Sequence, residues 1–194
     1  MQAEQGESFV EEEPIRDEVP VIAERLLPSG FLEIGNRDAP IVLLLYTEHH
    51  CRYCKDFFIE QFPKLIAEYV NSGTLRLQIG ILPLKKYAAS DTAAIGMLCA
   101  ATQSKGIAMH KLLFELGAKD EKTLLSHAAT LELDTALFTQ CLHSPDTGAT
   151  VEREKSIARS LDVTLVPTLF LNGEKSVGLP YYADLKGMID AKLR

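Results

Sequence analysis

Two cysteines lie where an expected strand gives way to an expected helix, and this junction limits the folds open to the chain. The strand is the run Ile41–Tyr46, which is apolar on both faces and therefore reads as a central parallel strand. The helix follows from about Cys51 to Asn71, with apolar residues at helical spacing. Cys51 and Cys54 thus fall at the start of a helix that follows directly on a buried strand.

This position has a chemical consequence for the first cysteine. The first turn of a helix has unpaired N–H groups and a positive dipole end, so a thiolate on Cys51 would be stabilised there. Cys54 lies one turn further on and faces the same side, so the two sulfurs can form a disulfide. The pair therefore predicts a redox site rather than an inert structural disulfide.

A metal site is the second alternative, because His49 and His50 precede the two cysteines. A zinc site needs four ligands that converge as a tetrahedron. On a rigid turn between strand and helix, adjacent histidines point in different directions. We therefore favour the redox site and expect no metal. His110, His127 and His143 are scattered along helical segments, and we expect them at the surface or at helix caps.

The neighbouring segments predict a mixed sheet. Phe31–Ile34 reads as a short first strand, and Thr74–Ile81 alternates as a strand does. Strand, helix and strand in this order predict a right-handed crossover and a parallel pair. Pro63 removes one backbone hydrogen bond and should kink the intervening helix.

The chain ends with a hairpin and a helix. Thr168–Leu171 reads as a strand, Asn172 and Gly173 give the strongest hairpin signal in the chain, and Tyr182–Leu193 carries an apolar stripe. Residues 84–161 show helical patterns and no strand signal, with Asp120 and Asp134 as expected N-caps and a last helix from Pro145. Since the sheet resumes afterwards, these helices form an insertion.

The predicted fold class is α/β, a central mixed sheet flanked by helices with an inserted all-helical subdomain. Residues 29–83 and 162–194 would form the sheet domain, and residues 84–161 the helical subdomain. Residues 1–28 hold eight acids and two bases, and they read as a flexible acidic tail. Within it, Val21–Leu27 could form a short amphipathic helix or a strap onto the domain. Nineteen acids and eighteen bases make the remainder nearly neutral, which excludes a basic nucleic-acid surface.

Two questions stay open at this point. The chain begins without the basic head and apolar middle of a signal peptide, so either the protein is cytoplasmic or a targeting segment is missing from this sequence. Cys99 and Cys141 each lie in a helical pattern. They are bonded to each other in an oxidising compartment, or they are two small buried thiols, which is the alternative we favour.

Four stretches resemble one known family. They are Ile34–Val42 at the entry to the first core strand, Tyr46–Cys54 at the cysteine pair, Leu98–Ala101 in the helices, and Val166–Gly173. Together they identify residues 31–194 as similar to the DsbA-like branch of the thiol–disulfide oxidoreductases. This resemblance implies a thioredoxin fold with an inserted helical domain.

The resemblance also implies residue roles. Cys51 would be the exposed nucleophile and Cys54 the shielded resolving thiol. Pro167 would be a cis-proline beside them, and the backbone of Val166 would pair with an extended substrate peptide. Arg52 and Tyr53 would fill the dipeptide that tunes the redox balance.

Several residues depart from the family pattern. Many relatives have proline at the position of Arg52, and a fixed cation there should lower the pKa of Cys51 and make the site oxidising. Many relatives also have a buried acid at the position of Leu45. Glu48 is the candidate proton acceptor in its place, although a solvated loop acid is the commoner role for such a residue. His50 would add positive potential or simply be exposed.

These roles predict an enzyme that needs no cofactor. It would oxidise unfolded or extended cysteine-containing proteins, which would bind in a groove between the sheet and the inserted helices. A redox partner, with a membrane protein as one candidate, would then restore the disulfide of the enzyme. Tyr53 is also found in isomerase-type dipeptides, so an isomerase or reductase is an alternative, and a non-enzymatic metal-binding or interaction module is another. We expect a monomer outside the cytosol, in the periplasm or cell envelope of a bacterium, with the acidic tail as a spacer from a missing signal or anchor.

Overall fold

The computed structural model describes residues 23–115, 117 and 119–194. The strands are β1 (Glu24–Leu26), β2 (Leu32–Ile34), β3 (Ile41–Thr47), β4 (Leu75–Ile81), β5 (Thr168–Leu171) and β6 (Glu174–Val177). The helices are α1 (Arg52–Asp56), α2 (Phe62–Leu65), α3 (Ser90–Ala101), α4 (Gly106–Glu115), α5 (Glu121–Thr130), α6 (Thr135–Leu142), α7 (Pro145–Ser160) and α8 (Tyr182–Lys192). Most of the predicted acidic tail, residues 1–22, lies outside the described residues.

The six strands form one mixed sheet in the order β1-β2-β4-β3-β5-β6. β3 and β4 run parallel, as the strand–helix–strand order predicts, and the other neighbours are antiparallel. β5 and β6 form the hairpin expected at Asn172 and Gly173, where both residues have positive φ angles of 48° and 87°. This sheet and its helices confirm the predicted fold class.

β1 was not expected, because its residues were assigned to the flexible tail. It pairs antiparallel with β2 and extends the sheet by one strand. The carboxylate of Glu24 accepts hydrogen bonds from the backbone N–H groups of Gly106 and Ile107 at the start of α4, the second at 2.9 Å. Three residues with no apolar alternation give no strand signal. Of the two alternatives left open for Val21–Leu27, the structure shows Glu24–Leu26 as a strap that joins the edge of the sheet.

The helix after the cysteine pair is continuous but irregular. α1 leads into a π-helical turn at Phe57–Gln61, α2 follows, and a second π-helical turn covers Ile66–Val70. Pro63 is the second residue of α2 and follows directly on the first π-helical turn. The irregularity next to Pro63, where a kink was expected, is the π-helical turn immediately before it.

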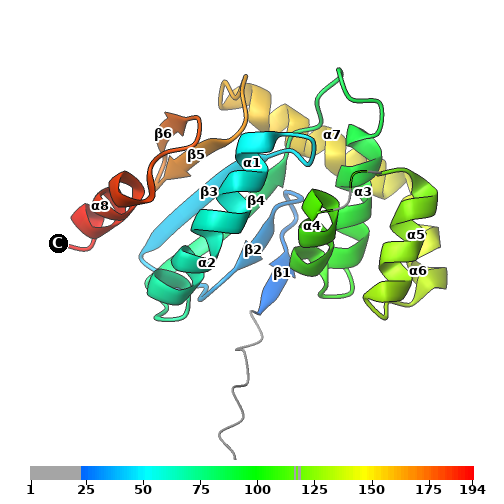
Figure 1. Ribbon diagram of the computed structural model, residues 1–194, viewed down its shortest axis with the longest axis horizontal. Helices are drawn as coiled ribbons and strands as arrows, with labels where there is room; N and C mark the ends of the chain where they lie inside the picture. Colours follow the sequence, from blue (N-terminus) through cyan, green and yellow to red (C-terminus); the bar gives the residue numbers. More distant parts are fainter. Residues whose placement is uncertain (1–22, 116, 118) are drawn as a thin grey trace, which may run out of the picture.

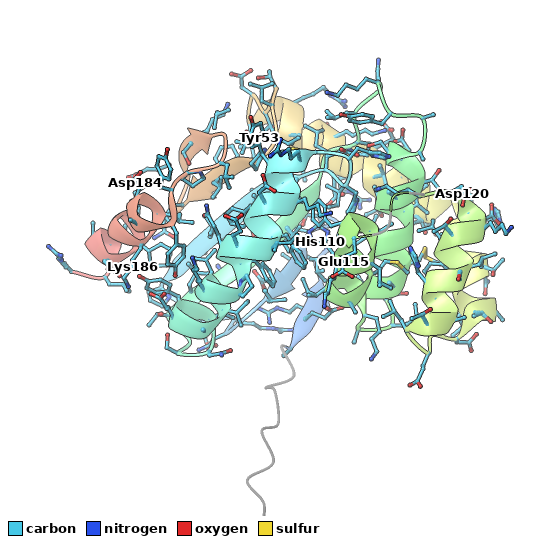
Figure 2. The ribbon with its side chains drawn as sticks, in the orientation of Figure 1. Tyr53, His110, Glu115, Asp120, Asp184 and Lys186 are labelled. Atoms are coloured by element: carbon cyan, nitrogen blue, oxygen red, sulfur yellow. A yellow bond between two sulfur atoms is a disulfide. The ribbon has the colours of Figure 1, made fainter. Side chains whose placement is uncertain are left out.

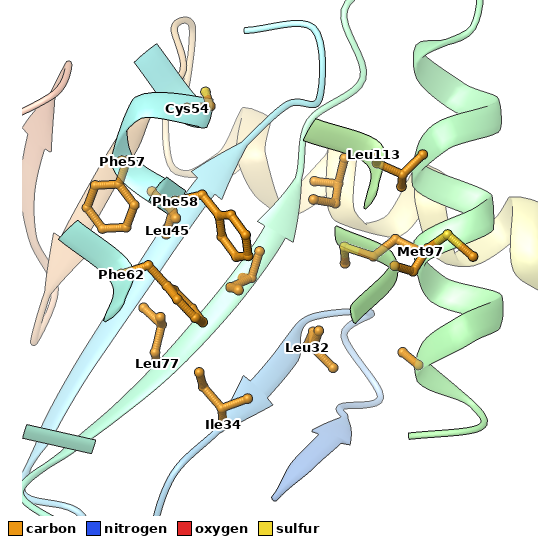
Figure 3. Close-up of a cluster of buried hydrophobic side chains, with 14 of the residues drawn as sticks. Leu32, Ile34, Leu45, Cys54, Phe57, Phe58, Phe62, Leu77, Met97 and Leu113 are labelled. Carbon is orange, nitrogen blue, oxygen red and sulfur yellow. The ribbon is translucent and has the colours of Figure 1, made fainter. Parts of the chain in front are cut away.

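The sheet is covered on both faces (Figure 1). On one face, α1, α2 and α8 pack onto the inward side chains of β3 and β4, which include Leu43. Figure 3 shows two others of this set, Leu45 and Leu77. Phe57 and Cys54 belong to the same buried cluster. On the other face, α7 lies against Tyr46, Phe31 and Phe170.

α7 also buries an acid on that second face. Glu154 is fully buried against Gly30, whose positive φ of 99° and lack of a Cβ allow this close approach. Among the residues that the structure describes, neither of its oxygens has a hydrogen-bond partner of ordinary geometry. Burial therefore raises the pKa of Glu154 well above its usual value, and the nearby backbone of Ile81 opposes this only partly.

Helices α3 to α7 occupy the chain between β4 and β5, and most of them lie to one side of the sheet (Figure 1). Asp120 and Asp134 cap α5 and α6, as predicted. A disulfide between Cys99 and Cys141 joins α3 to α6, so the favoured assignment of two free thiols was wrong. The two residues are 42 positions apart, and only the packing of the two helices brings them together. Within the described residues, every helix is too short or too polar to span a bilayer.

Candidate active site

Cys51 is the residue that precedes α1 and caps it. Its backbone is extended, with φ −83° and ψ 117°, and its Sγ accepts the N–H of Cys54 at 3.3 Å. The same sulfur lies 3.5 Å from the carbonyl oxygen of Val166, to which the thiol donates. Cys51 is partly exposed, whereas Cys54 is buried at 1% exposure. The predicted position of the thiol at a helix start is therefore present.

The two thiols differ in their tendency to ionise. The pKa of Cys51 is lowered to about 7, first by a hydrogen bond from the Cys54 thiol and then by the backbone N–H groups of Cys54 and Tyr53. Burial and the charge of Glu48 oppose this lowering. Burial raises the pKa of Cys54 far above its usual value, and its hydrogen bond to Cys51 adds to this. Near neutral pH the thiolate of the pair therefore forms on Cys51, which is about half ionised there, while Cys54 stays protonated.

Arg52 does not supply the effect that the sequence suggested. Its side chain is 88% exposed and makes only a loose ion pair with Asp56, at 3.8 Å. The pKa of Cys51 is lowered as expected, but hydrogen bonds at the helix start cause it. Tyr53 is 61% exposed and lies at the start of α1 (Figure 2).

The Val166–Pro167 peptide bond is cis, which is the geometry that the family resemblance implied. Pro167 precedes β5, and Thr168 pairs with Tyr46 near the end of β3. Because β3 leads into the cysteine turn, this pairing brings two segments more than a hundred residues apart to the same place. Val166 is half-buried, and its carbonyl lies 3.5 Å from the sulfur of Cys51.

Glu48 is fully buried, so the commoner role of a solvated loop acid was the wrong expectation. Its carboxylate accepts the backbone N–H of His50 at 2.7 Å and contacts the His50 Nδ1 at 2.7 Å. The hydroxyl of Ser90 donates to it at 2.7 Å, and the same hydroxyl accepts the N–H of Leu84 at 3.0 Å. Glu48 thus fixes both the turn before Cys51 and the loop before α3.

Ser90 was not expected to take part in the site. It is the first residue of α3, and its hydroxyl is used by Glu48 and Leu84. No sequence signal could have revealed this, because Glu48 and Ser90 are 42 positions apart. Tyr87 was also missed. Its ring stacks on His50 with a centroid distance of 4.6 Å and an interplanar angle of 15°.

The two adjacent histidines point apart, as expected for this turn. His50 faces Glu48 and Tyr87, whereas His49 is buried and its Nε2 contacts the Nδ1 of His110 at 2.8 Å. Among the described residues, no three His, Cys, Asp or Glu side chains are grouped as metal ligands would be. The turn thus separates the residues on which the metal alternative depended.

The surface placement expected for the other histidines holds only for His143, which is 61% exposed and contacts Glu121. His110 lies on α4 and is fully buried, with its ring against those of Phe58 and Phe114. His127 is also buried. Burial lowers the pKa of His110 to about 3, so the ring is neutral at physiological pH.

A hollow of about 490 Å³ opens beside Cys51, and we call it the Cys51 hollow. Its walls are the start of α1, the loop Leu84–Tyr87 and the segment Thr164–Val166. A larger apolar groove of about 830 Å³ lies between α1–α2 and α4, where the sequence placed the substrate groove, but the cysteines do not line it. A substrate would therefore reach the sulfur of Cys51 through the smaller hollow.

Comparisons with known proteins agree with this geometry. A family model described as "Thioredoxin" matches residues 29–191. "Probable disulfide bond formation protein D" of Bacillus anthracis is 22% identical over 170 residues, which are 83% of this chain and 77% of that protein. The structure of BdbD from Bacillus subtilis (oxidised) gives a TM-score of 0.76 at 18% identity, over 89% of this chain and 97% of that one. The structure of Wolbachia pipientis alpha-DsbA1 gives a TM-score of 0.75 at 23% identity, over 86% of this chain and 92% of that one.

At these identities the two solved structures establish a shared fold. The family model adds more, because it covers nearly the whole described chain, from the loop before β2 into α8. It includes both cysteines and the cis-proline. The chain therefore belongs to the thioredoxin family.

Proposed function

We propose that the protein is a thiol–disulfide oxidoreductase of the DsbA type, which oxidises cysteine pairs in other proteins. The observation that carries this proposal is the difference between the two thiols. Cys51 is accessible and has a pKa of about 7, while Cys54 is buried and resists ionisation. A thiolate that is stable in the reduced enzyme is a good leaving group, which makes the disulfide form an oxidant.

In the forward reaction, a substrate thiolate attacks the Cys51 sulfur of the Cys51–Cys54 disulfide. The bond between the two enzyme sulfurs breaks, and Cys54 leaves and takes up a proton. A second substrate thiolate then attacks the substrate sulfur of the mixed disulfide, and Cys51 leaves as a thiolate. The substrate loses two electrons and two protons, and the enzyme gains the electrons until a partner disulfide or other two-electron oxidant resets it.

The supporting residues act around these two sulfurs. We assign Val166 the role of pairing its backbone with an extended substrate, since its carbonyl lies beside Cys51, and Pro167 shapes that segment. Glu48 and His50 hold the turn before Cys51. We assign to Glu48, whose charge acts on Cys51, the exchange of a proton near the two thiols. Arg52 and Tyr53 are exposed and would contact substrate rather than tune the thiolate.

Location and assembly follow from the same chemistry. A disulfide-forming enzyme is useful outside the reducing cytosol, so we propose an extracytoplasmic site of action, in a periplasm or cell envelope. The relatives named for disulfide bond formation support this. The two cysteines of one chain complete the redox pair, and we propose that the protein acts as a monomer, which size-exclusion chromatography would test.

The test is the refolding of a reduced, denatured disulfide-containing protein by the oxidised enzyme, with Cys51→Ser as the control. We expect stoichiometric oxidation by the wild type and none by the variant. The reduction potential distinguishes the alternatives, because an oxidant lies near about −120 mV and a reductase near about −270 mV. Equal activity of wild type and variant would exclude the proposed function.

A further inference from the structure

The charged side chains that line the Cys51 hollow are all cationic. Arg52, Lys85 and Lys86 lie in its walls, and all three are exposed. Within the described part of the chain, no Asp or Glu lines this hollow. The chain as a whole has a net charge of −7, so the composition alone would not predict a cationic surface at the thiol.

The loop that carries the two lysines is tied to the network at Glu48. Their loop is bound to Ser90 through the N–H of Leu84, and Ser90 in turn donates to Glu48. Tyr87 stacks on His50, and the Nζ of Lys86 lies 4.8 Å from the centre of the Tyr87 ring. The same contacts that fix the cysteine turn therefore fix the loop that carries the cations.

These charges are not neutralised by neighbouring acids. Neither Lys85 nor Lys86 makes an ion pair with any residue that the structure describes. Arg52 has Asp56 at 3.8 Å, a loose pair at an exposed position. An anionic group entering the hollow would thus meet up to three cations with little competition from the protein.

We propose that the preferred substrates are extended segments whose cysteine is flanked by Asp or Glu. This inference rests on the proposed function, and it names the class of substrate for that site. A peptide paired with the Val166 backbone advances about 3.3 Å per residue and turns alternate side chains to opposite sides. Acids within two or three residues of the cysteine then lie close to the walls that hold Arg52, Lys85 and Lys86.

The experiment uses the full-length oxidised protein and three reduced dithiol peptides of equal length. Their cysteines are flanked by Asp, by Ser or by Lys. The second-order rate of peptide oxidation is measured at low salt and divided by the rate of each peptide with an uncharged small-molecule disulfide. This division removes the effect of the flanking charge on the peptide thiols themselves. We expect the Asp peptide to react about tenfold faster than the Lys peptide.

Salt and substitutions identify the source of the preference. The ratio of the normalised rate of the Asp peptide to that of the Lys peptide should fall towards one at about 1 M salt, where the Debye length is about 3 Å. The double variant Lys85→Gln/Lys86→Gln should reduce the ratio at least severalfold. Lys64→Gln/Lys122→Gln removes the same charge from exposed positions outside the hollow, and it should leave the ratio unchanged.

The outcomes separate the two proposals. Oxidation of all three peptides at equal normalised rates, or a preference for the Lys peptide, would overturn the inference and leave the proposed function standing. A preference that persists in high salt or in the Lys85/Lys86 variant would also overturn it. Failure to oxidise any peptide would instead contradict the proposed function.

Discussion

The clearest prediction concerns the origin of the Cys51 thiolate. The hydrogen bond from the Cys54 thiol is the largest contribution to the lowered pKa, and the backbone N–H groups of Cys54 and Tyr53 contribute less. Substitution Cys54→Ala removes the first contribution and keeps the backbone. We therefore expect the titration midpoint of Cys51 to rise from about 7 towards, but not fully to, the value of 9.0 for an unperturbed thiol.

The size of the effect follows from the thiolate fraction. At pH 7 a thiol with a pKa of about 7 is about half ionised, whereas one with a pKa of 9 is about 1% ionised. Once the midpoint lies well above pH 7, raising it further by about one pH unit lowers the thiolate population by about tenfold. The rate of alkylation falls by less, because a more basic thiolate is also a better nucleophile.

The assay is the ultraviolet absorbance of the thiolate during a pH titration of the reduced protein. Cys54 ionises far above the accessible range, so the wild type should give one transition near pH 7. Arg52→Gln is the matched control, because its exposed guanidinium is expected to shift the midpoint very little. A Cys54→Ala midpoint equal to that of the wild type, or a larger shift in Arg52→Gln, would refute this account.

Three further predictions concern buried titratable groups. The pKa of His110 is depressed, so the stability linked to its neutral ring is present above pH 6.5 and is lost as the pH falls. Between pH 7 and pH 5 the free energy of unfolding of the wild type should fall by about 2 kcal/mol more than that of His110→Gln. Urea unfolding measures this, with the exposed His143→Gln as the control. The pKa of Glu154 is raised, so burying this side chain destabilises the folded state increasingly as the pH rises above about 4.5. Glu154→Gln should therefore be more stable than the wild type at pH 7 in the same unfolding assay. Equal stability at pH 7 would contradict the raised pKa of Glu154. The charge of Glu48 raises the pKa of Cys51, so Glu48→Gln should move the Cys51 midpoint downwards in the same absorbance titration, and an upward shift would count against it.

Local patterns in the chain predicted the elements that depend on neighbours in sequence. The apolar run before Cys51, the turn at Asn172 and Gly173, and the caps at Asp120 and Asp134 each obey rules that operate within about one turn or one strand. The fold class follows from the order of these elements. The two cysteines of the candidate site were predictable for the same reason, since their spacing and their position at a helix start are local properties.

Contacts between distant residues were decided only by the tertiary structure. Glu48 meets Ser90, His49 meets His110, and Cys99 meets Cys141, at separations of 42, 61 and 42 residues. A residue type has the same local signal whether it ends up buried or exposed, because burial depends on which helix packs against it. For this reason the sequence by itself determined where the reactive sulfur lies along the chain. The packing of α3, α4 and the loop before α3 decided which side chains surround it, and which charges a substrate would meet there.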